Sequence, residues 1–271
     1  ENVPREERPA GAEAMIAAGV LKDPAVDAIF GVHVYANMPT GQVSWVSGPM
    51  IAAADSYEII VRGRQTHGAT PWAGVDPVVI GSQIVLALQT IVSRQVNITA
   101  QPAIVTVGQF EAGVRNNIIP DSARLVGTIR TFDSAMQKDI HERIRRTAQR
   151  VAESGGGTAE VTIETGNPVT YNDPALTARM EGTLKRVVGD SAAVIATPTT
   201  TAEDFSLFQQ KIPGLFVFLG GTPPNADPRT APANHSPKFF IDERALPIGT
   251  RTLVHLAVDY LTGSPPRAQG Q

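Results

Sequence analysis

The order of strand-like and helix-like segments between residues 55 and 164 constrains the fold more than any other feature of this chain. Strands are expected at 55–62, 103–110, 123–132 and 158–164, and helices at 76–94 and 134–153. The first strand alternates apolar and polar residues, whereas the first helical segment is a long run with helical apolar periodicity. The resulting βαββαβ order is typical of a ferredoxin-like sandwich, in which two helices cover one face of an antiparallel sheet.

Cap and turn residues mark the ends of the two helices. Asp76 is a suitable cap and is followed by Pro77, which is favoured at the first helical position. The second helix is expected to begin after Asp133 or Ser134 and to end at the glycines of 155–157. Its many charged residues are interpreted as a solvated face and not as a binding patch.

Segments on both sides of this unit predict a second domain of the α/β class. Strands or helices are expected at 26–35, 173–188, 214–221 and 242–261. The runs 26–35 and 214–221 are strongly apolar, which is typical of buried strands. We therefore predict an α/β domain formed by residues 1–50 and 168–271, into which a ferredoxin-like domain of residues 51–167 is inserted.

Charge and composition exclude several classes of partner. The 271 residues carry a formal net charge of −3, which gives no electrostatic reason to bind nucleic acid or an anionic membrane. No apolar run is expected to approach the roughly 20 residues of a membrane span. Cysteine is absent, which leaves no thiolate chemistry and no disulfide framework. The compartment stays open, with the cytoplasm favoured.

His67 lies in a loop, RGRQTHGATPWAGVDP, between the first predicted strand and the first predicted helix. The glycines and prolines of this loop disfavour a helix or a regular strand, so a rigid scaffold would present the imidazole outward. A surface histidine without a task and a functional histidine are both compatible with this position.

Two further histidines, His33 and His235, lie at strand-end or loop positions. Acidic residues at comparable positions are Glu1, Glu203 and Asp204. Imidazole and carboxylate groups are the ligands that Zn²⁺ or Mn²⁺ takes where thiolates are absent. The spacings are long and fit no local metal motif, so a metal site and structural roles both remain open. His255, in the last predicted helix, is interpreted as packing among apolar neighbours, and His141, in the charged second helix, as structural or solvated.

A set of short motifs extends over nearly the whole chain. They are GAEAM at 11–15, IFGVHV at 29–34, GPMIA at 48–52, VRGRQTHGATP at 61–71, GVDP at 74–77, NIIP at 117–120, GTIR at 127–130, AEDF at 202–205 and NHSP at 234–237. In these motifs and their order, the chain resembles the metal-dependent amidohydrolase/peptidase family of hippurate hydrolase, aminoacylase-type enzymes and the plant indole-acetyl-amino-acid hydrolases.

The resemblance implies a zinc-peptidase-like α/β catalytic domain with an inserted ferredoxin-like lid. It implies two divalent metal ions, Zn²⁺ or Mn²⁺, in the intact protein, with Glu1, His33 and His235 among their ligands. Such ions lower the pKa of a bridging water and polarise an amide carbonyl. Glu203 and Asp204 belong to the family's Glu-Asp-Phe stretch and are expected beside the site.

The resemblance also assigns roles to the lid and a substrate to the enzyme. His67 would reach the active site of a partner subunit and help to polarise the scissile carbonyl, so a homodimer formed through the lid is expected. Asn117 and Arg130 would hold the free carboxylate of the substrate, because a guanidinium can grip a carboxylate through two hydrogen bonds. The implied reaction is hydrolysis of the amide bond in small N-acyl amino acids.

Two departures from the family pattern lead to further expectations. The family's first portion, with a His-x-Cys-Gly-His-Asp-like metal stretch and the general-base Glu, would lie ahead of Glu1. We therefore expect the chain to correspond to the C-terminal two-thirds of such an enzyme, and to be inactive or incomplete and without bound metal by itself. Trp72 stands where many relatives have a second lid histidine, so the acyl-group specificity is expected to differ.

A hypothesis from another class is a non-catalytic ferredoxin-like module for dimerisation or for binding a small ligand. Under that hypothesis, His67, Asn117 and Arg130 would tolerate substitution. Kinetics of an Arg130→Ala variant distinguish the two classes, because only the enzyme uses Arg130 to hold its substrate.

Overall fold

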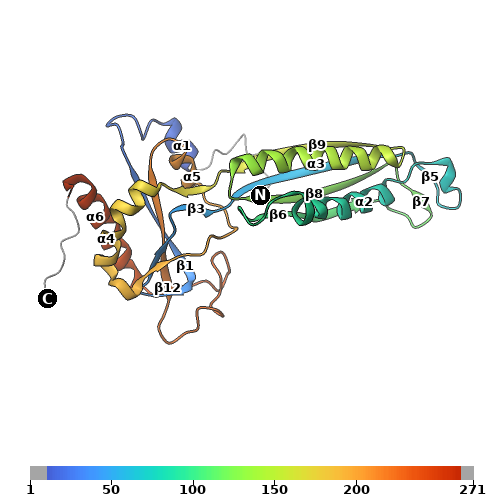
Figure 1. Ribbon diagram of the computed structural model, residues 1–271. Helices are drawn as coiled ribbons and strands as arrows, with labels where there is room; N and C mark the ends of the chain where they lie inside the picture. The colour runs from blue at the N-terminus through green and yellow to red at the C-terminus, as the bar shows by residue number, and fades with distance from the viewer. Residues whose placement is uncertain (1–10, 264–271) are drawn as a thin grey trace. The chain divides into compact units, whose positions relative to one another are not determined.

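The computed structural model describes residues 11–263 of the chain (Figure 1). The backbone divides into two compact units. Residues 51–169, together with 200–202, form what we call the inserted unit. Residues 11–50, 170–199 and 203–263 form what we call the discontinuous unit.

The main elements of the inserted unit follow the predicted βαββαβ order. They are β4 (Ala53–Arg62), α2 (Pro77–Thr90), β6 (Ala103–Ala112), β8 (Ser122–Thr131), α3 (Ser134–Ser154) and β9 (Thr158–Asn167). The four strands form one antiparallel sheet in the order β6-β8-β4-β9. Strands β4 and β8 are therefore central, and β6 and β9 are the edges.

Both helices of the inserted unit share one hydrophobic core with its sheet. Along β4, the buried residues Tyr57, Ile59 and Val61 alternate with more exposed ones. The helix residues in the same core include Ile80, Ile84 and Leu88 of α2 and Ile140, Ile144 and Ala148 of α3. Alternation with a period of two on the strand and of 3.6 on the helices places these residues on facing surfaces.

Aspartate caps begin both helices, as predicted. Asp76 accepts a hydrogen bond from the backbone N–H of Val78 at 2.8 Å, and Asp133 accepts one from Met136 at 2.7 Å. The first helix ends differently from the prediction. It is α-helical to Thr90 and continues as a π-helical turn over Ile91–Gln95. A single widened turn hardly alters the apolar period, so the sequence does not reveal it.

One segment of the described chain, Pro77–Gln95, is long and apolar enough to cross a membrane by length and composition alone. Sequence reasoning did not single out this segment, because polar residues such as Gln83 and Gln89 interrupt its apolar residues. Its residues Ile80, Ile84 and Leu88 lie in the core of the inserted unit, which is typical of the core helix of a folded domain.

The discontinuous unit is built on a four-stranded mixed sheet in the order β1-β12-β2-β11. The strands are β1 (Ile29–Pro39), β2 (Val43–Trp45), β11 (Ala193–Ile195) and β12 (Gly214–Thr222). Other elements are α1 (Gly11–Ala17), β3 (Gly48–Ile51), β10 (Thr170–Asn172), α4 (Pro174–Val188), α5 (Phe205–Gln209) and α6 (Ala245–Thr262). Strand β1 is parallel to β12, and α4 and α6 share a hydrophobic core with this sheet.

The buried side chain of Asn172 joins three segments of the discontinuous unit. Its Nδ2 donates to the carbonyls of Val46 and Phe216, both at 2.9 Å, and its Oδ1 accepts from the Phe216 N–H at 2.7 Å. Oδ1 also accepts from Gln209 Nε2 at 3.2 Å. A fully buried amide is stable only when both its oxygen and its nitrogen are paired, as they are here.

Candidate functional site

His33 lies in β1 with one ring nitrogen bonded to the chain's own backbone. Its Nδ1 is 2.6 Å from the carbonyl oxygen of Val34. Because a carbonyl only accepts, this contact places the proton on Nδ1 and leaves the lone pair of Nε2 available. Metal-binding histidines are typically oriented in this way, with the second nitrogen donating to a carbonyl or carboxylate. Nε2 lies 4.0 Å from Glu203 Oε2.

Glu203 and Asp204 serve different purposes just before α5. The Glu203 carboxylate accepts from the backbone N–H of Phe205 at 3.3 Å. Burial raises the pKa of Glu203, and the hydrogen bond from Phe205 and the charge of His33 oppose this. Asp204 Oδ2 instead accepts from the backbone N–H of Ala12, in the first turn of α1, at 3.0 Å. Glu203 is thus the acid that faces His33, and Asp204 anchors a helix.

The segment that carries His235 is attached to the same part of β1. Asn234 Oδ1 accepts from the Ala36 N–H at 2.9 Å, and Asn234 Nδ2 donates to the Val34 carbonyl at 2.8 Å. The Val34 carbonyl therefore accepts from both Asn234 and His33. His235 itself has φ of 68°, in the left-handed region that non-glycine residues seldom adopt. The structure thus brings the two histidine-bearing segments together at β1.

Other parts of the expected metal site are not assembled by the described chain. Glu1, the third implied ligand, lies outside the described residues. Within residues 11–263, no three histidine, aspartate or glutamate side chains form a group that could hold a metal ion.

His67 lies in the inserted unit, in β5 (Thr66–His67), which pairs with β7 (Ile118–Ile119). Its Nδ1 accepts a hydrogen bond from the backbone N–H of Ala69 at 3.0 Å. The ring nitrogen that remains, Nε2, therefore carries the proton in the neutral imidazole and is a donor. The N–H of Gly68 donates to the Asn117 carbonyl at 2.8 Å, so His67 and Asn117 belong to one hydrogen-bonded pair of loops.

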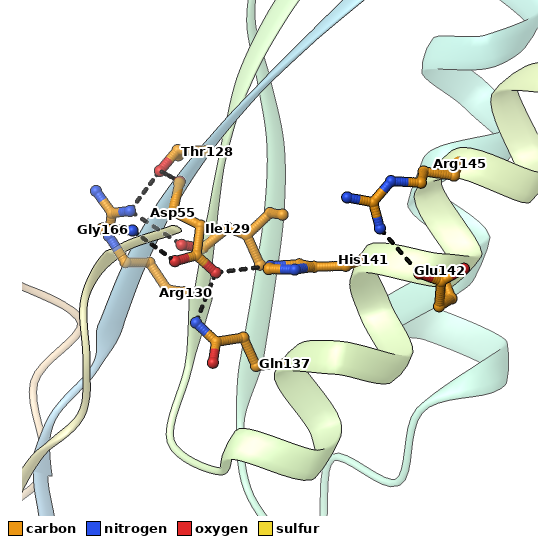
Figure 2. A network of polar contacts seen from close by, with 9 residues as sticks. All are labelled: Asp55, Thr128, Ile129, Arg130, Gln137, His141, Glu142, Arg145 and Gly166. Atoms are coloured by element: carbon orange, nitrogen blue, oxygen red, sulfur yellow. Dashed lines mark hydrogen bonds and ion pairs between the residues drawn. The ribbon is translucent and has the colours of Figure 1, made fainter. Parts of the chain in front are cut away.

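Arg130 lies near the C-terminal end of β8, the end away from β5 and β7. Its Nη1 donates to the hydroxyl of Thr128 and to the Ile129 carbonyl (Figure 2). Among residues 11–263, no acidic side chain forms an ion pair with Arg130. A guanidinium without an acidic partner can bind an external carboxylate by donating hydrogen bonds to it.

Asn117 and Arg130 do not come together within one chain. Asn117 precedes β7, which lies just before the start of β8 at Ser122, whereas Arg130 is the penultimate residue of β8. At a rise of roughly 3.3 Å per residue, β8 extends about 26 Å from Ser122 to Arg130. Figure 1 shows β5 and β7 together at one end of the long sheet. One inserted unit therefore cannot bring both residues to one small carboxylate.

The comparisons with known proteins place this arrangement in a family. Residues 2–259 match the profile of peptidase family M20/M25/M40, and the chain belongs to this family. Its mixed α/β fold agrees with a solved structure of the family, the YXEP protein of Bacillus subtilis, a dinuclear metal-binding peptidase. That match has a TM-score of 0.77 at 32% identity and covers 94% of this chain and 62% of the other.

Two curated relatives are similar over almost all of the chain. Thermostable carboxypeptidase 2 of Saccharolobus solfataricus is 35% identical over 251 residues, which cover 92% of this chain and 62% of the relative. N-acetylcysteine deacetylase of Bacillus subtilis is 35% identical over 263 residues, which cover 94% of this chain and 64% of the relative. The chain thus spans slightly less than two thirds of the length of these relatives.

Sequence reasoning gave no role to three residues that organise these positions: Asn234, Asp55 and Thr128. A signal for Asp55 was present, because it is in phase with the buried residues Tyr57 and Ile59 of β4. An acid at an inward-facing strand position predicts a buried polar partner. No comparable local signal marks Asn234, whose partners on β1 are about 200 residues away in the sequence.

Proposed function

We propose that the protein is a metal-dependent hydrolase that cleaves the amide bond of N-acyl amino acids. The observation that carries this proposal is that one backbone carbonyl of β1, that of Val34, accepts hydrogen bonds from both His33 and Asn234. The Val34 carbonyl orients the His33 imidazole and holds the segment of His235, and the free Nε2 of His33 lies 4.0 Å from the Glu203 carboxylate. Membership of peptidase family M20/M25/M40 supports the same reaction class.

The residues at β1 fit a divalent cation. Neutral imidazole and carboxylate are ligands for zinc and manganese, and no cysteine is available in this chain to replace them. We propose that His33, His235 and Glu1 contribute to a site for two such ions. When bound, the ions would activate a water molecule and polarise the amide carbonyl. Glu203 would lie beside His33 and balance the positive charge.

The substrate class follows from the chemistry of Arg130. The guanidinium has no acidic partner within the described chain and can bind the free carboxylate of an amino acid through two hydrogen bonds. The names of the two relatives, a carboxypeptidase and an N-acetylcysteine deacetylase, agree with a substrate that carries an amino acid carboxylate. We propose that the inserted unit is a ferredoxin-like lid, residues 51–167, that presents Arg130 to the substrate.

A second copy of this chain would complete the site. His67 and Asn117 lie at the opposite end of β8 from Arg130, so we propose that one protomer supplies Arg130 and its partner supplies His67 and Asn117. The exposed Nε2–H of His67 would then donate to the scissile carbonyl. The inserted unit offers an apolar contact surface, because Val79 and Leu86 are exposed on α2, a helix that also packs against the edge strand β6.

Replacing Leu86, which is 71% exposed, by glutamate is expected to convert a dimer into a monomer. A charge at the centre of an apolar contact would have to be buried without a partner. Sedimentation equilibrium of the wild-type protein and the variant measures this directly. The matched control is Leu261→Glu, at a position on α6 that is 82% exposed; this variant is expected to remain dimeric. A wild-type protein that is monomeric at micromolar concentration would contradict the proposal.

The Arg130→Ala variant of the full-length protein tests the proposed substrate class. We expect kcat/KM for N-acetyl-L-alanine to fall about 100-fold, because a charge-assisted carboxylate contact is worth about 3 kcal/mol. Arg130→Lys keeps the charge but not the planar fork, and should lose about 10-fold.

The control substrate is N-ethylacetamide, which is N-acetylalanine without its carboxylate. Its hydrolysis should be equally slow in the wild-type protein and in both Arg130 variants. Unchanged kinetics of Arg130→Ala on N-acetylalanine would contradict the proposed role of Arg130 and favour a non-catalytic module.

A further inference from the structure

We propose that Thr128 is a positioning residue for the Arg130 guanidinium, and that the backbone carbonyl of Asp55, on the neighbouring strand β4, fixes the Thr128 hydroxyl. Figure 2 shows these residues as one connected network. The inference deepens the proposed function, because it concerns the residue to which we assign the substrate carboxylate.

The first link is the hydroxyl of Thr128. Arg130 Nη1 donates to Thr128 Oγ1, and Thr128 Oγ1 donates to the Asp55 carbonyl at 3.1 Å. A hydroxyl has one proton, so the bond to Asp55 aims its lone pairs at the guanidinium. The two residues share one face of β8, since they are two apart, and threonine has a stiff χ1 angle. Together these contacts restrict Arg130 to one orientation.

The second link is the carboxylate of Asp55, whose side chain is 1% exposed. Its Oδ2 accepts from Gln137 Nε2 at 2.8 Å and from His141 Nε2 at 2.7 Å, and its Oδ1 accepts from the Gly166 N–H at 3.0 Å. Gln137 and His141 are one turn apart on α3 and therefore share a face. Three donors hold the carboxylate, so the backbone of Asp55 is anchored to α3 and to β9.

The position of Asp55 in the sheet explains why this anchor is needed. The register of β4 against β9 shifts between Ala54 and Ser56, so the ladder is interrupted at Asp55 on that side, whereas the pairing of β4 with β8 is regular there. The Asp55 carboxylate accepts from Gly166 of β9 at this irregularity and so ties the two strands together. The Asp55 carbonyl, held by the pairing with β8 and by these side-chain bonds, receives the Thr128 hydroxyl. The network therefore transmits the position of α3 to the group that would bind the substrate.

The test is the isosteric variant Thr128→Val in the full-length protein. We expect KM for N-acetyl-L-alanine to rise about 10-fold with kcat changed less than about 2-fold, because only the placement of the carboxylate clamp is lost. N-ethylacetamide hydrolysis should not change. Thr128→Ser keeps the hydroxyl and should restore KM to within about 2-fold of the wild-type value.

The matched control lies three residues further along the same strand. Thr131 is fully buried, and its Oγ1 has no hydrogen-bond partner among the described residues. Thr131→Val removes no hydrogen bond and should leave KM unchanged. Thermal unfolding of all three variants shows whether each is folded, and a purely structural role for Thr128 would lower the Tm without a carboxylate-specific change in KM.

The Arg130→Ala variant separates failure of this inference from failure of the proposed function. If Arg130→Ala loses activity on N-acetylalanine while Thr128→Val behaves as wild type, the positioning role is overturned and the proposed function stands. If neither substitution changes KM, both are overturned. A rise in KM for Thr128→Val that Thr128→Ser reverses supports both.

Discussion

Replacing His33 by alanine is expected to lower kcat/KM of the full-length protein for N-acetyl-L-alanine by about 1,000-fold or more. The loss follows from the place of His33 at β1, where Nδ1 is bound to the Val34 carbonyl and Nε2 is free to bind a cation. A metal centre stabilises the charge of the transition state by several kcal/mol, and about 4 kcal/mol corresponds to a factor of 1,000.

The control for this substitution is His255→Ala. His255 is exposed on α6 of the same unit, although we expected it to pack among apolar neighbours, and it takes no part in the proposed site. Its substitution should change kcat/KM less than about 2-fold. Circular dichroism of both variants distinguishes loss of the site from loss of the fold. Comparable activity of His33→Ala and His255→Ala would contradict the assignment of His33.

The largest expected effect on stability is that of Asn172→Leu. Leucine has a similar shape but leaves the carbonyls of Val46 and Phe216 and the N–H of Phe216 without this partner in a buried region. Each unpaired buried group costs about 1–3 kcal/mol, so we expect the free energy of unfolding to fall by about 4 kcal/mol. Urea unfolding followed by tryptophan fluorescence measures it, since the buried Trp45 precedes Val46.

The same substitution at Asn37 is the control for Asn172→Leu. Asn37 is exposed, and its side chain donates to the Pro228 carbonyl at 2.9 Å. Water can replace that bond, so Asn37→Leu should cost no more than about 1 kcal/mol. Equal destabilisation by the two substitutions would show that burial of the Asn172 amide is not what stabilises the discontinuous unit.

Local patterns in the sequence predicted the order of the elements in the inserted unit. Alternation along β4 and the caps Asp76 and Asp133 are properties of neighbouring residues, and each has a direct physical cause. The π-helical turn at Ile91–Gln95 and the two-residue strands β5 and β7 were not predicted. They are too short to produce a period, and tertiary contacts decide their geometry.

The candidate site was less accessible to sequence reasoning. Residue types and the family resemblance identified His33 and His235 as candidates, but the sequence did not indicate that the Val34 carbonyl links them. His141 was interpreted as structural or solvated, and the structure shows it bound to the buried Asp55. Such bonds join residues that are far apart in the sequence, and no local pattern encodes them.

The separation of Asn117, before the start of β8, from Arg130, near the end of β8, was also not anticipated. Both were assigned to one carboxylate through the family resemblance, and one chain cannot bring them together. This separation makes the homodimer part of the proposed active site. The number of residues in β8 gives the distance between its two ends, because the rise per residue of a strand is nearly constant.

The measurement that tests the central claim most directly is the number of zinc and manganese ions bound per chain. The full-length protein, purified without chelator, and its His33→Ala and His255→Ala variants would be compared by elemental analysis. Our account expects two ions per chain in the wild-type protein and in His255→Ala, and fewer than two in His33→Ala. A wild-type protein that hydrolyses N-acetylalanine with no bound metal, or a His33→Ala variant that retains two ions, would contradict it.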